Sequence, residues 1–124
     1  MLSNIDDFVE RYVAVWNEGD PALRRKGVSE IWADDAVYAN QGAEFRGHAG
    51  IEAAVTEAYE QFVKNGEYVF KTAKVDENHE AVRFTWDMVP TAGGEPASIG
   101  TQLFLVGEDG RIVHDYQFID KMPS

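Results

Sequence analysis

A chain of 124 residues in which 44% of the side chains are hydrophobic has the length of one domain, so we expect residues 1–124 to share a single core. The 22 acidic residues outnumber 11 Lys and Arg, and the net charge of −11 disfavours nucleic acid and membrane surfaces as partners. No Cys is present, which excludes disulfides, thiolate nucleophiles and cysteine metal sites.

The start of the chain, Met1 to Asp7, has neither the basic residues nor the apolar stretch of a secretory signal. No apolar run approaches the ~20 residues that a membrane-spanning helix needs. We therefore expect a soluble, cytoplasmic protein.

Helical spacing of apolar residues dominates the first part of the chain. Ser3 and Asp6 resemble a capping box before a helix that ends near Asn17. Asp20-Pro21 is a typical start for a second helix. We expect this helix to end at Asp34-Asp35, before a short strand over 36–39.

The clearest helix follows Gly47 and keeps apolar residues at helical spacing from Ile51 to Val63, until Asn65-Gly66 stops it. The apolar period then changes to two, which predicts strands over 68–75, 81–89, 97–106 and 112–119, the last three as an antiparallel meander. Helices that precede a run of hairpins indicate an α+β fold, with three N-terminal helices packed on a curved, mainly antiparallel sheet.

Three segments, Tyr12–Asp20, Trp32–Tyr38 and Phe45–Ile51, resemble the nuclear-transport-factor-2-like superfamily, and within it the SnoaL-like proteins, which include polyketide cyclase and ketosteroid isomerase relatives. The resemblance covers nearly the whole chain. It implies a cone-shaped, cystatin-like α+β roll whose conical pocket takes a small apolar ligand, and a homodimer formed through the outer face of the sheet. Because this fold serves many activities, the resemblance does not by itself assign one.

Comparison with ketosteroid isomerases matches Tyr12 to their helix-one tyrosine. The positions of their two carboxyl groups fall on Asn40 and Thr101. An amide cannot take a proton from carbon near neutral pH, so steroid isomerisation by that mechanism is not expected.

The last strand carries the remaining candidate acids. The acid of related epoxide hydrolases falls on Gln117, and that of SnoaL-like cyclases is best matched by Asp120. Because side chains alternate along a strand, Asp115 and Asp120 cannot both point into the pocket without a bulge, and the isomerase register favours Asp115. An inward Asp115 is either a general acid or base or one member of a buried polar cluster.

Side chains on elements that border the pocket in the resembled fold are the candidate ligand contacts. They are Trp16, Tyr38, Asn40, Tyr59, Trp86, Met88, Thr101, Leu103 and Gln117, beside the candidate catalytic pair Asp115 and Tyr12. The three His residues show no metal-ligand spacing, and we expect neither a metal nor a cofactor.

The sequence leaves three functions open, and it favours the first two over the third. The first is a cofactor-independent isomerase, cyclase or hydrolase that acts on an apolar, oxygenated molecule and uses Asp115 as its titrating group. The second is a ligand-binding or accessory protein that uses the same pocket without turnover. The third is a partner-binding dimer whose pocket is filled by its own side chains.

Overall fold

The computed structural model describes residues 4–122. The helices are α1 (Ile5–Asn17), α2 (Pro21–Ile31) and α3 (Gly47–Ala58), and a π-helical turn, η1 (Tyr59–Val63), continues α3. The strands are β1 (Trp32–Ala39), β2 (Glu44–Arg46), β3 (Tyr68–Asn78), β4 (Ala81–Pro90), β5 (Ser98–Val106) and β6 (Ile112–Lys121).

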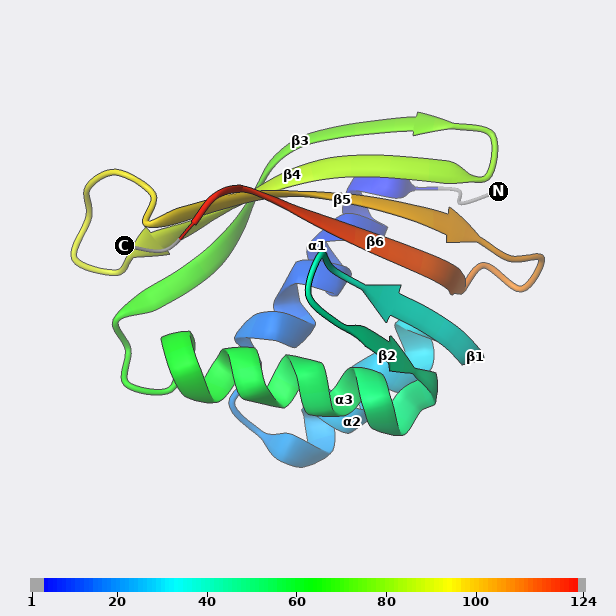
Figure 1. The fold of residues 1–124 in the computed structure, drawn as a ribbon, viewed down its shortest axis with the longest axis horizontal. Coiled ribbons are helices and arrows are strands. Elements are labelled where there is room, and N and C mark those ends of the chain that lie inside the picture. Colours follow the sequence, from blue (N-terminus) through cyan, green and yellow to red (C-terminus); the bar gives the residue numbers. More distant parts are fainter. Residues whose placement is uncertain (1–3, 123–124) are drawn as a thin grey trace.

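The six strands form one curved sheet in the order β2-β1-β6-β5-β4-β3, with antiparallel pairs except for β1 beside β6. The helices gather on one side of this sheet, and β3 bends toward the end of α3 (Figure 1). The expected α+β architecture and the meander of the last three strands are confirmed. None of the helices described in residues 4–122 is long and apolar enough to cross a membrane.

Two helix boundaries differ from the sequence-based expectation. Ser3 lies outside the described residues, and the side chain of Asn4 caps α1 by accepting a hydrogen bond from the backbone N–H of Asp7 at 3.0 Å. The second helix ends at Ile31 rather than at Asp34-Asp35, and β1 begins at once, because Trp32 is buried beside β6 in the extended conformation. The short strand β2 was not predicted.

Alternation along β4 places its apolar side chains on the concave face, as expected. Val82, Phe84, Trp86 and Met88 are buried. Gly100 of β5 lies directly opposite Trp86, and the indole lies over it, where another residue would place its Cβ. The missing side chain at Gly100 therefore lets the Trp86 ring lie close to the sheet.

We expect Gly100→Ala to destabilise the fold by about 1–3 kcal/mol, because the added methyl would lie 2.2 Å from a ring carbon of Trp86. Gly42→Ala is the matched control: its Cβ would lie 3.7 Å from the nearest atom, and the change should stay within about 0.5 kcal/mol. Urea unfolding measures both, and equal stabilities of the two variants would contradict this packing.

Candidate functional site

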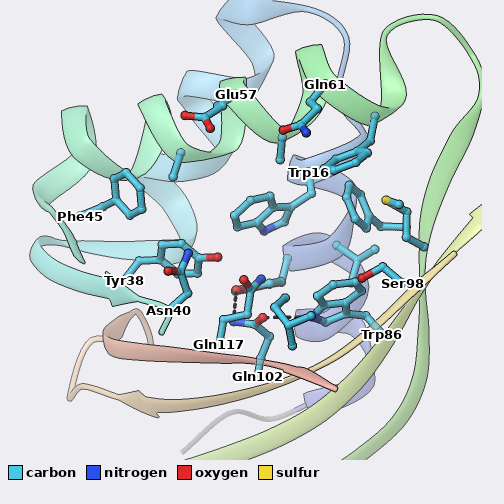
Figure 2. A pocket seen from close by; sticks show the side chains of 18 of the residues that line it. Trp16, Tyr38, Asn40, Phe45, Glu57, Gln61, Trp86, Ser98, Gln102 and Gln117 are labelled. Atoms are coloured by element: carbon cyan, nitrogen blue, oxygen red, sulfur yellow. Dashed lines mark hydrogen bonds between the residues drawn. The ribbon is translucent and has the colours of Figure 1, made fainter. Parts of the chain in front are cut away.

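A cavity of about 200 Å³ lies between α1, the α3–η1 helix and the concave face of the sheet (Figure 2). Its walls are mainly aromatic and include Trp16, Tyr38, Phe62, Phe70, Phe84 and Trp86. Glu57 and Gln61, both exposed, lie on the helix at its edge. Glu57 is the one formally charged side chain among the described residues that line the cavity. The chain therefore leaves an open, mostly apolar space rather than filling the cone with its own side chains.

Most of the candidate ligand contacts border this cavity. They are Tyr12, Trp16, Tyr38, Asn40, Trp86, Met88 and Gln117. These side chains come from α1, β1, β4 and β6, together with Asn40 just after β1, so the topology brings together residues from both halves of the chain.

Three of the candidate ligand contacts do not line the cavity. Thr101 and Leu103 lie on the outer face of β5, where the Thr101 hydroxyl donates to Asp120 at 2.6 Å and Leu103 is 37% exposed. Tyr59 stacks under the guanidinium of Arg24 at 4.9 Å, away from the cavity. Alternation in β5 presents Gln102 to the interior instead.

Asp115 points inward and is fully buried, but it lies behind the pocket wall rather than on it. Its Oδ2 accepts hydrogen bonds from the Tyr12 hydroxyl at 2.6 Å and from Trp32 Nε1 at 3.1 Å. Its Oδ1 accepts one from Gln102 Nε2 at 2.7 Å. Asp120 is exposed on the other face, so the register of the last strand favours Asp115 as the inward carboxyl.

Gln102 connects this carboxylate to the pocket. Its Nε2 also donates to the Tyr12 oxygen at 2.9 Å, and its Oε1 accepts from Trp86 Nε1 at 3.0 Å (Figure 2). An indole nitrogen can only donate, so Trp86 fixes which end of the amide faces Asp115. Gln102 was not among the candidates from the sequence. A polar residue in a strand that also contains the apolar residues Ile99, Leu103 and Leu105 is typical of a position that faces solvent.

Burial is the main influence on the pKa values of Asp115 and Tyr12, the two ionisable groups of this network. Desolvation raises the pKa of Asp115 to about 6, against the lowering effect of the hydrogen bonds from Tyr12, Gln102 and Trp32. Burial, and then the charge of Asp115, raise the pKa of Tyr12 well above its ordinary value, and the same causes raise that of Tyr38. Both tyrosines therefore stay neutral near pH 7, while Asp115 can gain or lose a proton.

The indole N–H of Trp16 is a buried donor that borders the pocket. Trp16 is 8% exposed, and within residues 4–122 its Nε1 has no hydrogen-bond partner. The nitrogen edge of the ring faces the side of the cavity on which Gln102 and Gln117 lie (Figure 2). The N–H is near enough to Tyr12 to lower the pKa of its hydroxyl, although it is not in hydrogen-bond geometry. A buried donor of this kind costs free energy unless a ligand or water accepts from it.

Asn40 supplies a second oriented polar group. Its Oδ1 accepts from the backbone N–H groups of Gly42 and Ala43, both at 2.9 Å. The amide orientation is thereby fixed, and the NH₂ group remains to donate elsewhere.

No group of three or more Asp, Glu and His side chains in the described part of the chain is placed to hold a metal ion. His48, near the start of α3, hydrogen-bonds through Nε2 to the backbone carbonyl of Trp32 at 2.7 Å.

Stability should depend on pH through Asp115. Because its pKa is raised from 3.8 to about 6 in the fold, the native state holds this proton more tightly than the unfolded chain, and the associated stability is lost as the pH rises toward 6. Relative to Asp115→Asn, the unaltered protein should be more stable at about pH 4.5 than at about pH 7.5 by about 2 kcal/mol. Urea unfolding of both proteins at the two pH values measures this difference. A constant difference between them would contradict the raised pKa.

Comparison with known proteins agrees with this architecture. None of the curated proteins is detectably similar. A SnoaL-like family protein from Agrobacterium tumefaciens, to which isomerase activity has been ascribed, is 29% identical, with a TM-score of 0.82 over 92% of this chain and 95% of that one. A Sinorhizobium meliloti protein with an ascribed polyketide cyclase activity is 22% identical, with a TM-score of 0.67 over 90% and 93% of the two chains.

A third similar structure is that of a Kribbella flavida protein with an ascribed ketosteroid isomerase activity. It is 12% identical, with a TM-score of 0.69 over 95% of this chain and 78% of that one. The last two likenesses are evidence for the fold alone. They confirm the expected fold, in which three helices pack on a curved sheet. The family model that describes the SnoaL-like domain matches residues 9–115 of the sequence, and the chain therefore belongs to the SnoaL-like family.

Proposed function

We propose that this protein binds a small, mainly apolar molecule that carries an oxygen. The observation that carries the proposal is the buried N–H of Trp16, which has no partner among residues 4–122 and borders a cavity with aromatic walls. Apolar walls supply most of the affinity of such sites, and a few oriented polar groups select the ligand. A ligand oxygen that accepts from Trp16 would remove the cost of that unsatisfied donor.

Volume and charge narrow the class of ligand. A cavity of about 150 Å³ holds benzene, so a single-ring molecule suits the volume of about 200 Å³ here. A steroid nucleus would have to project out of the mouth. A ligand carboxylate would find no Lys, Arg or His among the described lining residues and would face the charges of Glu57 and Asp115. These features favour a neutral ligand.

Replacing Trp16 tests the proposal. Cyclohexanone and methylenecyclohexane have the same shape, and only the ketone can accept a strong hydrogen bond. We expect Trp16→Phe to keep an aromatic wall but to remove most of the preference for the ketone, a loss of roughly three- to tenfold in relative affinity.

Titration calorimetry measures both probes, and Tyr116→Phe, on the outer face of the sheet, is the control. A preference that survives unchanged in Trp16→Phe would contradict the role of this N–H. If the unaltered protein bound neither probe, the ligand-binding proposal itself would be wrong.

A second candidate is cofactor-independent acid–base catalysis of the isomerase, cyclase or hydrolase type. The observation in its favour is the 2.6 Å hydrogen bond from Tyr12, which borders the cavity, to a carboxylate whose pKa is raised to about 6. Since Asp115 does not line the cavity, any proton it exchanges with a ligand would pass through the Tyr12 hydroxyl. Turnover of a true substrate should then require both residues.

We also propose that two copies pair through the outer face of the sheet. Leu103, Tyr116 and Phe118 are 37%, 41% and 47% exposed there, and the register of β5 with β6 places them side by side. The helices lie on the opposite side of the sheet, so no helix within residues 4–122 covers this face (Figure 1). The outward apolar residues of β5 are accounted for if a second copy covers them.

Phe118→Lys should disrupt this dimer, because each copy would then bury an unpaired charge in the contact. Analytical ultracentrifugation should give a dimer for the unaltered protein and a monomer for the variant. Glu108→Lys, at the turn before β6, is the control for added positive charge and should remain dimeric. A monomeric unaltered protein would contradict the proposal.

A further inference from the structure

The three donors around Asp115 restrict what the neighbouring Tyr12 hydroxyl can do. Trp32 Nε1 and Gln102 Nε2 can only donate, so among the three partners only the Tyr12 hydroxyl can either donate or accept. While Asp115 is ionised, the single hydroxyl proton of Tyr12 is committed to Oδ2. The Tyr12 oxygen already accepts from Gln102. A hydroxyl oxygen can accept a second hydrogen bond. In this state Tyr12 can accept a hydrogen bond from a ligand but cannot donate one.

Protonation of Asp115 reverses this arrangement. A neutral carboxyl group must donate its own proton, and Tyr12 is the one partner of Asp115 among the described residues that can accept it. Tyr12 would then accept from both Asp115 and Gln102, and its hydroxyl proton would be released to donate into the cavity. The same tyrosine therefore offers an acceptor in one state and a donor in the other.

We propose that Asp115 determines which ligand oxygen the pocket selects: a hydroxyl while Asp115 is ionised, and a carbonyl once Asp115 has taken up a proton. This inference rests on the proposed ligand-binding function and specifies its ligand class. A hydroxyl oxygen can donate to Tyr12 while accepting from the unpartnered N–H of Trp16. A carbonyl oxygen can accept from Trp16 but, opposite an ionised Asp115, leaves the Tyr12 oxygen without a donor. Near neutral pH the structure thus favours a small alcohol, phenol or enol.

The surroundings of Asp115 leave few other groups that could produce such a pH dependence. Tyr12 faces it from α1, Gln102 from β5, and Trp32 and Tyr38 belong to β1. Of these only the two tyrosines can titrate, and burial raises the pKa of both, so they stay neutral. No Lys, Arg or His of residues 4–122 forms an ion pair with Asp115. Its pKa of about 6 places the change of preference within an accessible pH range.

The test compares cyclohexanol with cyclohexanone, which have nearly the same size and shape. At about pH 8 the unaltered protein should bind the alcohol roughly three- to tenfold more tightly, the worth of one hydrogen bond. At about pH 4.5 this preference should disappear or reverse, because Asp115 is then protonated and Tyr12 donates.

Tyr12→Phe should retain binding through Trp16 and the aromatic walls but lose the pH-dependent preference. Tyr116→Phe, on the outer sheet face, should behave as the unaltered protein. If Tyr12→Phe does not fold, the pH dependence of the two affinities in the unaltered protein still decides the question.

The outcomes separate this inference from the function on which it rests. Binding of both probes with no preference, or with one that does not change with pH, would overturn the role of Asp115 and leave the ligand-binding function standing. A pH-dependent preference that persists in Tyr12→Phe would do the same. If neither probe bound at any pH, both the function and the inference would fail.

Discussion

Burial of the Asp115 carboxylate is the constraint on which the rest of the site depends. A buried charge is tolerated only when hydrogen bonds replace its lost hydration. Tyr12, Trp32 and Gln102 provide them from three different elements, and Gln102 is oriented in turn by Trp86. One carboxylate thereby fixes a tyrosine, an amide and two indole rings, and with them the position of α1 against β1 and the sheet. Among the buried side-chain nitrogen and oxygen atoms of the described residues that line the pocket, Trp16 Nε1 is the one without a hydrogen-bond partner, and a ligand can satisfy it.

The same burial distinguishes this site from a conventional acid–base centre. A carboxylate that touched the substrate would line the cavity, whereas Asp115 lies one hydrogen bond behind it. Asn40, which the sequence resemblance matches to the isomerase base, has its side-chain oxygen occupied by two backbone N–H groups. The pocket thus combines an apolar space with directional polar groups, which suits selective binding, and any proton transfer depends on Tyr12. Membership of the SnoaL-like family is compatible with either role, because that fold hosts several activities.

Elements with a strong apolar period could be predicted from the sequence. Elements in which a polar residue faces the interior, or in which contacts with a distant strand set the boundary, could not. Helix α1, the four long strands and the inward face of β4 follow from periodicity, and alternation was enough to separate Asp115 from Asp120 in β6. The interior side of β5 was misassigned because apolar residues lie on both of its faces: Ile99 and Leu103 face outward, whereas Phe104 faces inward beside the polar Gln102. The need of buried Asp115 and Trp86 for hydrogen-bond partners outweighs the apolar pattern at Gln102, and that need arises from contacts between distant parts of the chain. The end of α2 was misplaced for a similar reason, since pairing with β6 holds Trp32 in a strand.

Titration of the Asp115 carboxyl carbon by NMR tests directly whether this group is a buried carboxylate that changes its protonation state near pH 6. Our expectation is a midpoint near 6, with a matching change in the ring signals of Tyr12 as its hydroxyl turns from Asp115 toward the cavity. A midpoint near 4, typical of a solvated aspartate, or a titration that leaves Tyr12 unaffected, would contradict it.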